Sequence, residues 1–129
     1  YYLQELKPKV RFNSSLVMDI GGYELRPHSD DQRVILNLLF YLPKDDENKE
    51  LGTSIYTPKE SAIPSEYQNQ PIARYPREWF NLVKTFPYQP NSLSSFVRSS
   101  QSFHGVEPTQ HRNYARKLML LSLMFNDDS

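Results

Sequence analysis

Two segments of ten residues, 33–42 and 116–125, are apolar at almost every position and leave few choices for the fold. Such a run is typical of a strand buried on both faces or of a buried helix segment. In the first segment, the β-branched and aromatic residues and the stop at Pro43 favour a strand. The second segment is strand or helix by pattern alone. Alternation puts the polar side chains of the first segment on one face, which consists of Ile35, Asn37, Leu39 and Tyr41.

Shorter segments elsewhere also predict strands, because turn-forming residues or proline end each of them. They are 15–20, 51–56, 91–98 and 101–106. Segment 76–84 begins with proline and predicts one or two helical turns. The Pro- and Ser-rich segment 59–77 predicts a long loop that could cover a substrate. Nine Tyr, seven Phe and only four Gly suit a β-rich domain. We therefore expect an all-β fold with minor helix, either a sandwich or a barrel.

The length of 129 residues predicts a single domain, 1–129, and the missing initiator Met predicts an incomplete N-terminus. Fifteen basic and fifteen acidic side chains give a formal net charge of zero, which argues against nucleic acid as a partner. The absence of Cys excludes disulfides, thiolate metal sites and cysteine nucleophiles. No apolar run approaches the roughly 20 residues of a membrane span, and no signal pattern is present. The default expectation is a cytoplasmic protein with no membrane partner.

Two short motifs, far apart in the chain, carry the residue types of a metal site. They are Pro27-His28-Ser29-Asp30 and His104-Gly105-Val106. Two imidazoles and one carboxylate, placed two residues after the first imidazole, are the ligands of the 2-His-1-carboxylate facial triad. That triad holds non-haem Fe(II) and leaves coordination positions open. Chance alone supplies a His and an acid at this spacing about half the time in such a chain, so a surface His beside a solvated Asp is the simplest alternative.

Three features favour the metal site over that alternative. Pro27 keeps the approach to His28 extended, so His28 is expected at the end of a strand. His104 lies on another predicted strand beside Gly105, which allows backbones to pack closely. Finally, Arg116 opens an apolar segment, where a buried guanidinium needs an anion.

In order and spacing, these motifs resemble those of the 2-oxoglutarate and Fe(II)-dependent oxygenases, in particular the prolyl-hydroxylase-like branch. The resemblance covers most of the chain from residue 16 to residue 125. It rests on Pro27-His28-Ser29-Asp30, Leu38-Leu39-Phe40-Tyr41-Leu42, Gly52, His104-Gly105-Val106-Glu107-Pro108 and Arg116-Lys117-Leu118. It implies a double-stranded β-helix, or jelly-roll, fold.

The resemblance also implies roles for individual residues. The catalytic iron ligands of that family carry over to His28, Asp30 and His104. The residues that line its 2-oxoglutarate pocket carry over to Arg116, Tyr41, Leu39 and Asn37. Arg116 would offer its planar fork to the far carboxylate of 2-oxoglutarate, and Arg112 is the alternative for that role.

The activity that the resemblance implies is that of a hydroxylase. 2-Oxoglutarate and O₂ would be the co-substrates, succinate and CO₂ the products, and ascorbate a candidate reductant. The primary substrate would be a peptidyl proline, another side chain or a small metabolite. Two alternatives stay open: a jelly-roll binding module, and a cupin-like metalloenzyme that does not use 2-oxoglutarate.

Overall fold

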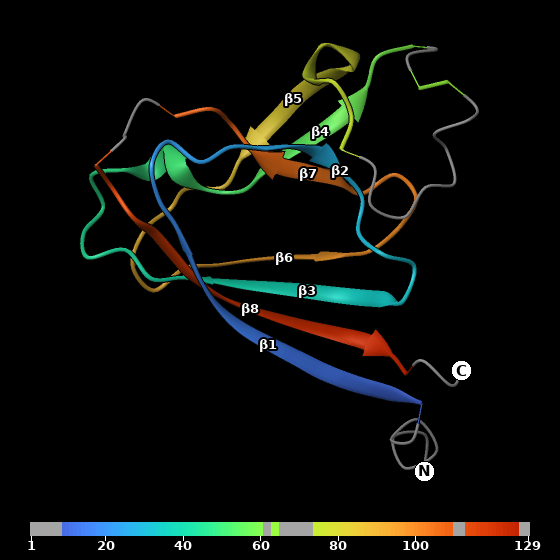
Figure 1. Ribbon diagram of the computed structural model, residues 1–129, viewed down its shortest axis with the longest axis horizontal. Helices are drawn as coiled ribbons and strands as arrows, with labels where there is room; N and C mark the ends of the chain where they lie inside the picture. Colours follow the sequence, from blue (N-terminus) through green and yellow to red (C-terminus); the bar gives the residue numbers. More distant parts are fainter. Residues whose placement is uncertain (1–8, 61–62, 65–73, 110–112, 127–129) are drawn as a thin grey trace.

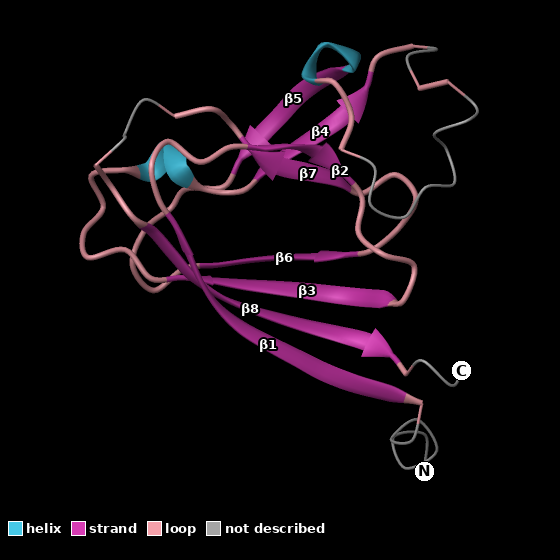
Figure 2. Cartoon of the chain, viewed as in Figure 1, coloured by secondary structure: helices cyan, strands magenta, loops and turns pink. Residues whose placement is uncertain are grey.

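The computed structural model describes residues 9–60, 63–64, 74–109 and 113–126. Within these residues the chain forms eight strands and two single turns of 3-10 helix, so the expected all-β fold is confirmed. The strands pair in two four-stranded sheets, and every pairing is antiparallel. Sheet I has the order β1-β8-β3-β6, and sheet II has the order β2-β7-β4-β5. The sheets form two layers, with sheet I below sheet II in Figure 1, and Figure 2 shows how little of the chain is helical.

The elements follow one another along the chain in this order. They are β1 (Val10–Asp19), β2 (Leu25–His28), β3 (Val34–Tyr41), η1 (Lys49–Leu51), β4 (Ser54–Pro58), η3 (Arg77–Trp79), β5 (Phe80–Thr85), β6 (Leu93–Val97), β7 (Phe103–Val106) and β8 (Arg116–Phe125).

The two long apolar segments become neighbouring inner strands of sheet I, β3 and β8. β8 lies between β1 and β3, so both of its edges are hydrogen-bonded and the segment is a strand. In the register of these strands, Arg116 on β8 faces Asp19 on β1, and Ser122 on β8 faces Asn37 on β3. All four of these polar residues come from strands of sheet I, and the pairings bring them into two cross-strand pairs.

β2 and β7 are short strands of sheet II, and they carry the two histidines. His28 and His104 are register partners, with an irregularity in the pairing between Leu25 and His28. A Cβ atom at Gly105 would lie 2.3 Å from the carbonyl oxygen of Leu25. Only glycine therefore allows β2 to approach β7 this closely, and this approach sets the spacing between the two imidazoles.

Two clusters of buried side chains form the core. One includes Leu39, Tyr41, Leu51, Tyr88 and Leu118, and the other includes Tyr56, Tyr75, Phe80 and Phe103. In the second cluster the rings of Phe80 and Phe103 lie 5.0 Å apart, centroid to centroid, in a tilted arrangement. Full burial of one such side chain contributes about 1.5–3 kcal/mol, so the clusters hold the strands that carry the histidines firmly in place.

Some segments differ from the sequence prediction. Segment 76–84 forms only the 3-10 turn η3 and then strand β5, because β4 offers an edge with which β5 pairs. Strand β1 begins at Val10, earlier than the predicted start at residue 15. The predicted covering loop, 59–77, lies largely outside the described residues. In the described part of the chain, no helix is long and apolar enough to cross a membrane.

Candidate metal centre

The three residues predicted as metal ligands meet on the side of sheet II that faces sheet I. His28 ends β2, Asp30 follows in the loop, and His104 comes from β7. One ligand atom from each residue lies within 4.8 Å of the other two. Nε2 of His28 is 3.7 Å from Oδ1 of Asp30, and Nε2 of His104 is 3.5 Å from Oδ2 of the same carboxylate. Residues far apart in sequence are thus within reach of one ion.

Hydrogen bonds fix the orientation of both imidazoles. Nδ1 of His28 is 3.0 Å from the carbonyl oxygen of Arg26, and Nδ1 of His104 is 3.0 Å from the carbonyl oxygen of Ser102. A carbonyl oxygen only accepts, so each Nδ1 carries the proton and donates it. In the neutral imidazole the lone pair is then on Nε2, which faces Asp30 in both cases. This outer contact is the one that metal-binding histidines usually make.

Two side chains from sheet I, linked in series by hydrogen bonds, hold the carboxylate of Asp30. Nδ2 of Asn37 donates to Oδ2 of Asp30 at 2.5 Å, and Oγ of Ser122 donates to Oδ1 of Asn37 at 2.5 Å. The Asn37 amide is therefore oriented by Ser122 so that its nitrogen points at Asp30. Nε of Arg98 also donates to the backbone oxygen of Asp30 at 3.1 Å. Asn37 thus positions the carboxylate, a contact that the resemblance does not assign to it.

The electrostatics of the site favour a bound cation. Burial, followed by the nearby His104, lowers the pKa of His28. Burial raises the pKa of Asp30, but the nearby imidazoles of His104 and His28, together with the charge of Arg98, outweigh it, so the pKa is lowered. At neutral pH the site thus offers the neutral imidazole of His28 and an ionised carboxylate. Imidazole and carboxylate donors on one face suit a divalent transition metal such as Fe(II), so the residues present fit that metal.

The trio opens onto a cavity of about 240 Å³ between the sheets. His28, Asp30 and His104 form one part of its wall, and Asp19 and Arg116 form another. Apolar side chains complete the lining, among them Val17, Leu39, Phe96, Leu118 and Leu120. The cavity is slightly smaller than the roughly 300 Å³ at which small-molecule sites begin, and its lining combines polar and apolar side chains.

The fold is similar to that of a prolyl-4-hydroxylase.

That enzyme comes from Pseudomonas putida. The match has a TM-score of 0.55 at 16% sequence identity and covers 96% of this chain and 59% of the hydroxylase. This chain therefore spans 59% of the length of the enzyme, and at this identity the likeness concerns the fold alone. A second solved structure, from the disulfide-linked pili of Bacillus endospore appendages, matches with a TM-score of 0.38 and 8% identity over 91% of this chain and 88% of that one. No family model and no curated protein matches the sequence.

Arg116, which the resemblance assigns to the 2-oxoglutarate carboxylate, already has a carboxylate beside it. One terminal nitrogen of the guanidinium, NH1, donates to Oδ2 of Asp19 at 2.7 Å. Nε donates to the backbone oxygen of Leu51 at 2.6 Å, and NH2 donates weakly to Oγ1 of Thr53 at 3.4 Å. The buried arginine does meet an anion, as expected, but that anion belongs to the protein. The alternative, Arg112, lies outside the described residues.

The other three residues assigned to the 2-oxoglutarate pocket differ in their surroundings. Leu39 and Asn37 line the cavity. The hydroxyl of Tyr41 accepts a hydrogen bond from the backbone N–H of Thr53 at 2.9 Å and lies 2.9 Å from Oγ of Ser94. Contacts within the protein thus engage the Tyr41 hydroxyl, and its ring packs near Arg116, with the guanidinium carbon 6.0 Å from the ring centroid.

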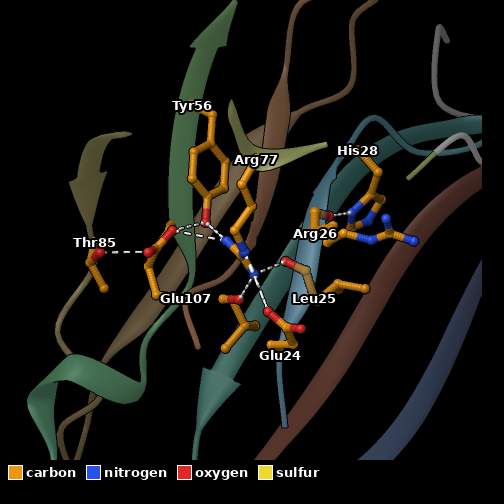
Figure 3. Close-up of polar contacts among 10 residues, drawn as sticks. Glu24, Leu25, Arg26, His28, Tyr56, Arg77, Thr85 and Glu107 are labelled. Carbon is orange, nitrogen blue, oxygen red and sulfur yellow. Dashed lines mark hydrogen bonds and ion pairs between the residues drawn. The ribbon is translucent and has the colours of Figure 1, made fainter. Parts of the chain in front are cut away.

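Sequence reasoning missed a polar cluster around Arg77 that joins the histidine strands (Figure 3). NH2 of Arg77 donates to the backbone oxygens of Val106 at 2.7 Å and Leu25 at 3.3 Å, so one side chain bridges the start of β2 and the end of β7. NH1 donates to Tyr56 and Glu107, each at 3.0 Å. Tyr56 also donates a very short hydrogen bond to Glu107. No local sequence signal marks these partners, because they come from separate strands.

Proposed function

We propose that this chain is a 2-oxoglutarate- and Fe(II)-dependent oxygenase with a double-stranded β-helix fold of the prolyl-hydroxylase-like branch. It would hydroxylate a substrate that is still to be identified. The observation that carries the proposal is the convergence of His28, Asp30 and His104, with both Nε2 lone pairs facing an ionised carboxylate at the wall of a cavity. The similarity of fold to a prolyl-4-hydroxylase supports it.

Each part of the site has a task in this proposal. His28, Asp30 and His104 would hold Fe(II), and Asn37 would keep the carboxylate turned toward it. When bound, Fe(II) and 2-oxoglutarate supply the oxidising chemistry, with O₂ as co-substrate and succinate and CO₂ as products. Arg116, which lines the same cavity, would attract the far carboxylate of 2-oxoglutarate.

A second cavity supports an approach route for the primary substrate. It measures about 270 Å³ and shares Tyr23, Leu25, His28 and Asp30 with the first cavity. Val34 and Arg74 are among the residues that line only the second cavity. A metal held by the trio would therefore lie beside the cavity that contains Arg116 and, at His28 and Asp30, beside the cavity that contains Arg74. An oxygenase needs such an arrangement, because co-substrate and primary substrate must reach one metal together.

One observation favours the alternative of a cupin-like metalloenzyme that does not use 2-oxoglutarate. The ion pair between Arg116 and Asp19 already neutralises the cation that a second carboxylate would seek. In that case the metal would still bind, and the cavity that contains Arg116 would take a smaller or uncharged ligand. The two proposals differ in whether the metal-loaded protein binds a 2-oxo acid by chelation.

The test is an anaerobic titration of the protein with Fe(II) and 2-oxoglutarate, followed by visible absorption. A charge-transfer band that requires His28 and Asp30 supports the oxygenase, so His28→Ala and Asp30→Ala are the informative variants. Asp31→Asn is the matched control, because Asp31 adjoins Asp30 in sequence but pairs with Arg33 on the surface. Metal binding without any band would overturn 2-oxoglutarate use and favour the cupin-like alternative. A folded protein that binds no metal would overturn both.

A further inference from the structure

The ion pair between Asp19 and Arg116 lies in the same cavity as the metal-binding trio. The two residues face one another across β1 and β8, and their side chains are only 9% and 7% exposed. Three contacts hold the guanidinium, to Leu51, Asp19 and Thr53, and these use three of the five N–H groups of an arginine. A ligand that reaches Arg116 from the metal therefore meets the carboxylate of Asp19 as well.

The formal charges in the cavity determine which chelating 2-oxo acid would leave no net charge there. Arg116 and Asp19 together are neutral. A divalent metal with the Asp30 carboxylate and two neutral imidazoles carries one positive charge, which the single carboxylate of a monocarboxylic 2-oxo acid balances. The second carboxylate of 2-oxoglutarate would leave one negative charge uncompensated inside the protein. An unbalanced buried charge is costly, because the low-dielectric interior screens it poorly.

We propose that Asp19 is a specificity-determining residue that opposes the far carboxylate of 2-oxoglutarate at Arg116. The cavity then discriminates only weakly between 2-oxoglutarate and a 2-oxo acid of the same length with an uncharged tail. This inference rests on the proposed function, since it concerns the co-substrate of that site. It assigns Asp19 a role that neither the sequence motifs nor the fold comparison contains.

The local structure leaves Asp19 little freedom to withdraw. Its backbone is paired with β8 at the last position of β1. The guanidinium is fixed from the other side by the carbonyl of Leu51 at 2.6 Å, so Arg116 has little freedom to turn toward a ligand. Asparagine at position 19 would keep the shape of the side chain and remove its charge. Arg116 would then lack a full counter-ion, and the far carboxylate of 2-oxoglutarate would supply one.

The experiment compares 2-oxoglutarate with 2-oxopentanoate, which has the same five-carbon chain but lacks the second carboxylate. Dissociation constants are measured under anaerobic conditions with the Fe(II)-loaded protein, by the charge-transfer band and by calorimetry. For the wild type we expect the two constants to differ by less than about tenfold. A buried guanidinium without its own carboxylate would instead prefer the dicarboxylate by a factor approaching about 10⁴, as sites with unpaired polar groups do.

For Asp19→Asn we expect 2-oxoglutarate to bind at least about tenfold more tightly, with 2-oxopentanoate changed by less than about threefold. A purely structural role for Asp19 would weaken both ligands alike and leave their ratio unchanged, so the ratio separates the two roles. An unchanged ratio in the variant would overturn the proposal. If Asp19→Asn does not fold, the wild-type ratio decides, because a preference for 2-oxoglutarate above about 100-fold overturns the proposal by itself. A band with neither acid would contradict the proposed function rather than the role of Asp19.

Discussion

Asp30 and Asp19 line the same cavity, yet the groups that contact their carboxylates differ in charge. Asp30 faces the Nε2 atoms of two imidazoles, and its own side-chain donor is the neutral amide of Asn37. Asp19 pairs at 2.7 Å with the guanidinium of Arg116. The first carboxylate therefore still attracts a cation, whereas the second already has one. A buried carboxylate therefore indicates a cation site only through the groups around it. The presence of an Asp is not sufficient evidence for such a site.

The largest effect should come from neutralising Asp30. We expect Asp30→Asn to lower the affinity for Fe(II) by more than about 100-fold, beyond the range seen when only an outer partner of a metal ligand is lost. Asp19→Asn should change that affinity by only a few-fold, because Asp19 contacts Arg116 and none of the three ligands. Metal titration monitored by calorimetry gives both values. Equal losses in the two variants would remove the distinction between the two carboxylates.

For the stability of the metal-free protein, we expect Asp19→Asn to have a larger effect than Asp30→Asn. Asp19→Asn leaves Arg116 buried without its ionic partner, and breaking such a pair from one side costs about 3–5 kcal/mol. Asp30→Asn removes no cationic side chain's principal partner, so its cost should be closer to the roughly 1 kcal/mol of an ordinary hydrogen bond. Urea denaturation of both variants, without metal, measures the difference. A larger loss of unfolding free energy for Asp30→Asn would contradict this assignment.

A smaller effect should follow from removing the amide that orients Asp30. We expect Asn37→Ala to weaken metal binding by about tenfold, the lower end of the range for outer partners of metal ligands. Ser122→Ala is the matched control, because Ser122 reaches Asp30 only through Asn37, and it should have a smaller effect. Metal affinities that do not change in Asn37→Ala would show that Asp30 needs no orientation from sheet I.

Glu107, a third carboxylate, is not among the residues that line the cavity, and it affects the stability of the fold at alkaline pH through Tyr56. Burial and the hydrogen bond to Glu107 raise the pKa of Tyr56 from 10.0 to about 12. Because the folded pKa is the higher one, the protonated hydroxyl stabilises the fold fully below pH 10 and loses this contribution as the pH rises toward 12. Tyr56→Phe should therefore lose less stability than the wild type over this interval, with unchanged Fe(II) affinity at neutral pH. Unfolding curves at several alkaline pH values provide the measurement, and parallel losses in the two proteins would contradict the role of Tyr56.

Much of the fold could be predicted because inner strands have a distinctive composition. β3 and β8 lie next to each other within sheet I and are flanked by β1 and β6, which explains their long apolar runs. β1 was predicted only in part, since Arg11 and Asn13 interrupt its apolar pattern although its backbone pairs with β8 along its whole length. β5 was missed because its backbone conformation depends on the edge of β4, a tertiary partner that outweighs local propensity.

The candidate site also has features that could be predicted from the sequence and features that could not. The residue types and spacing of His28 and Asp30, with His104 on a second strand, allowed the trio to be predicted, and the structure brings the three together. The position of Arg116 in an apolar segment predicted that it needs an anion, but not that Asp19 supplies it, because 97 positions separate the two residues. The role of the Tyr41 hydroxyl could not be predicted either, since alternation gives the face of a strand but not the partners at the end of a ring.

The position of β8 in sheet I has a consequence for how the protein is made. Among the described residues β8 is the last strand along the chain, yet it lies between β1 and β3 and pairs with both. While the ribosome is still translating the segment before Arg116, β1 and β3 each lack this partner. Unpaired strand edges promote aggregation. A premature stop codon or a protease cut just before Arg116 would therefore leave the edges of β1 and β3 unpaired and prone to aggregation. The same event would remove Arg116, the cation of the cavity.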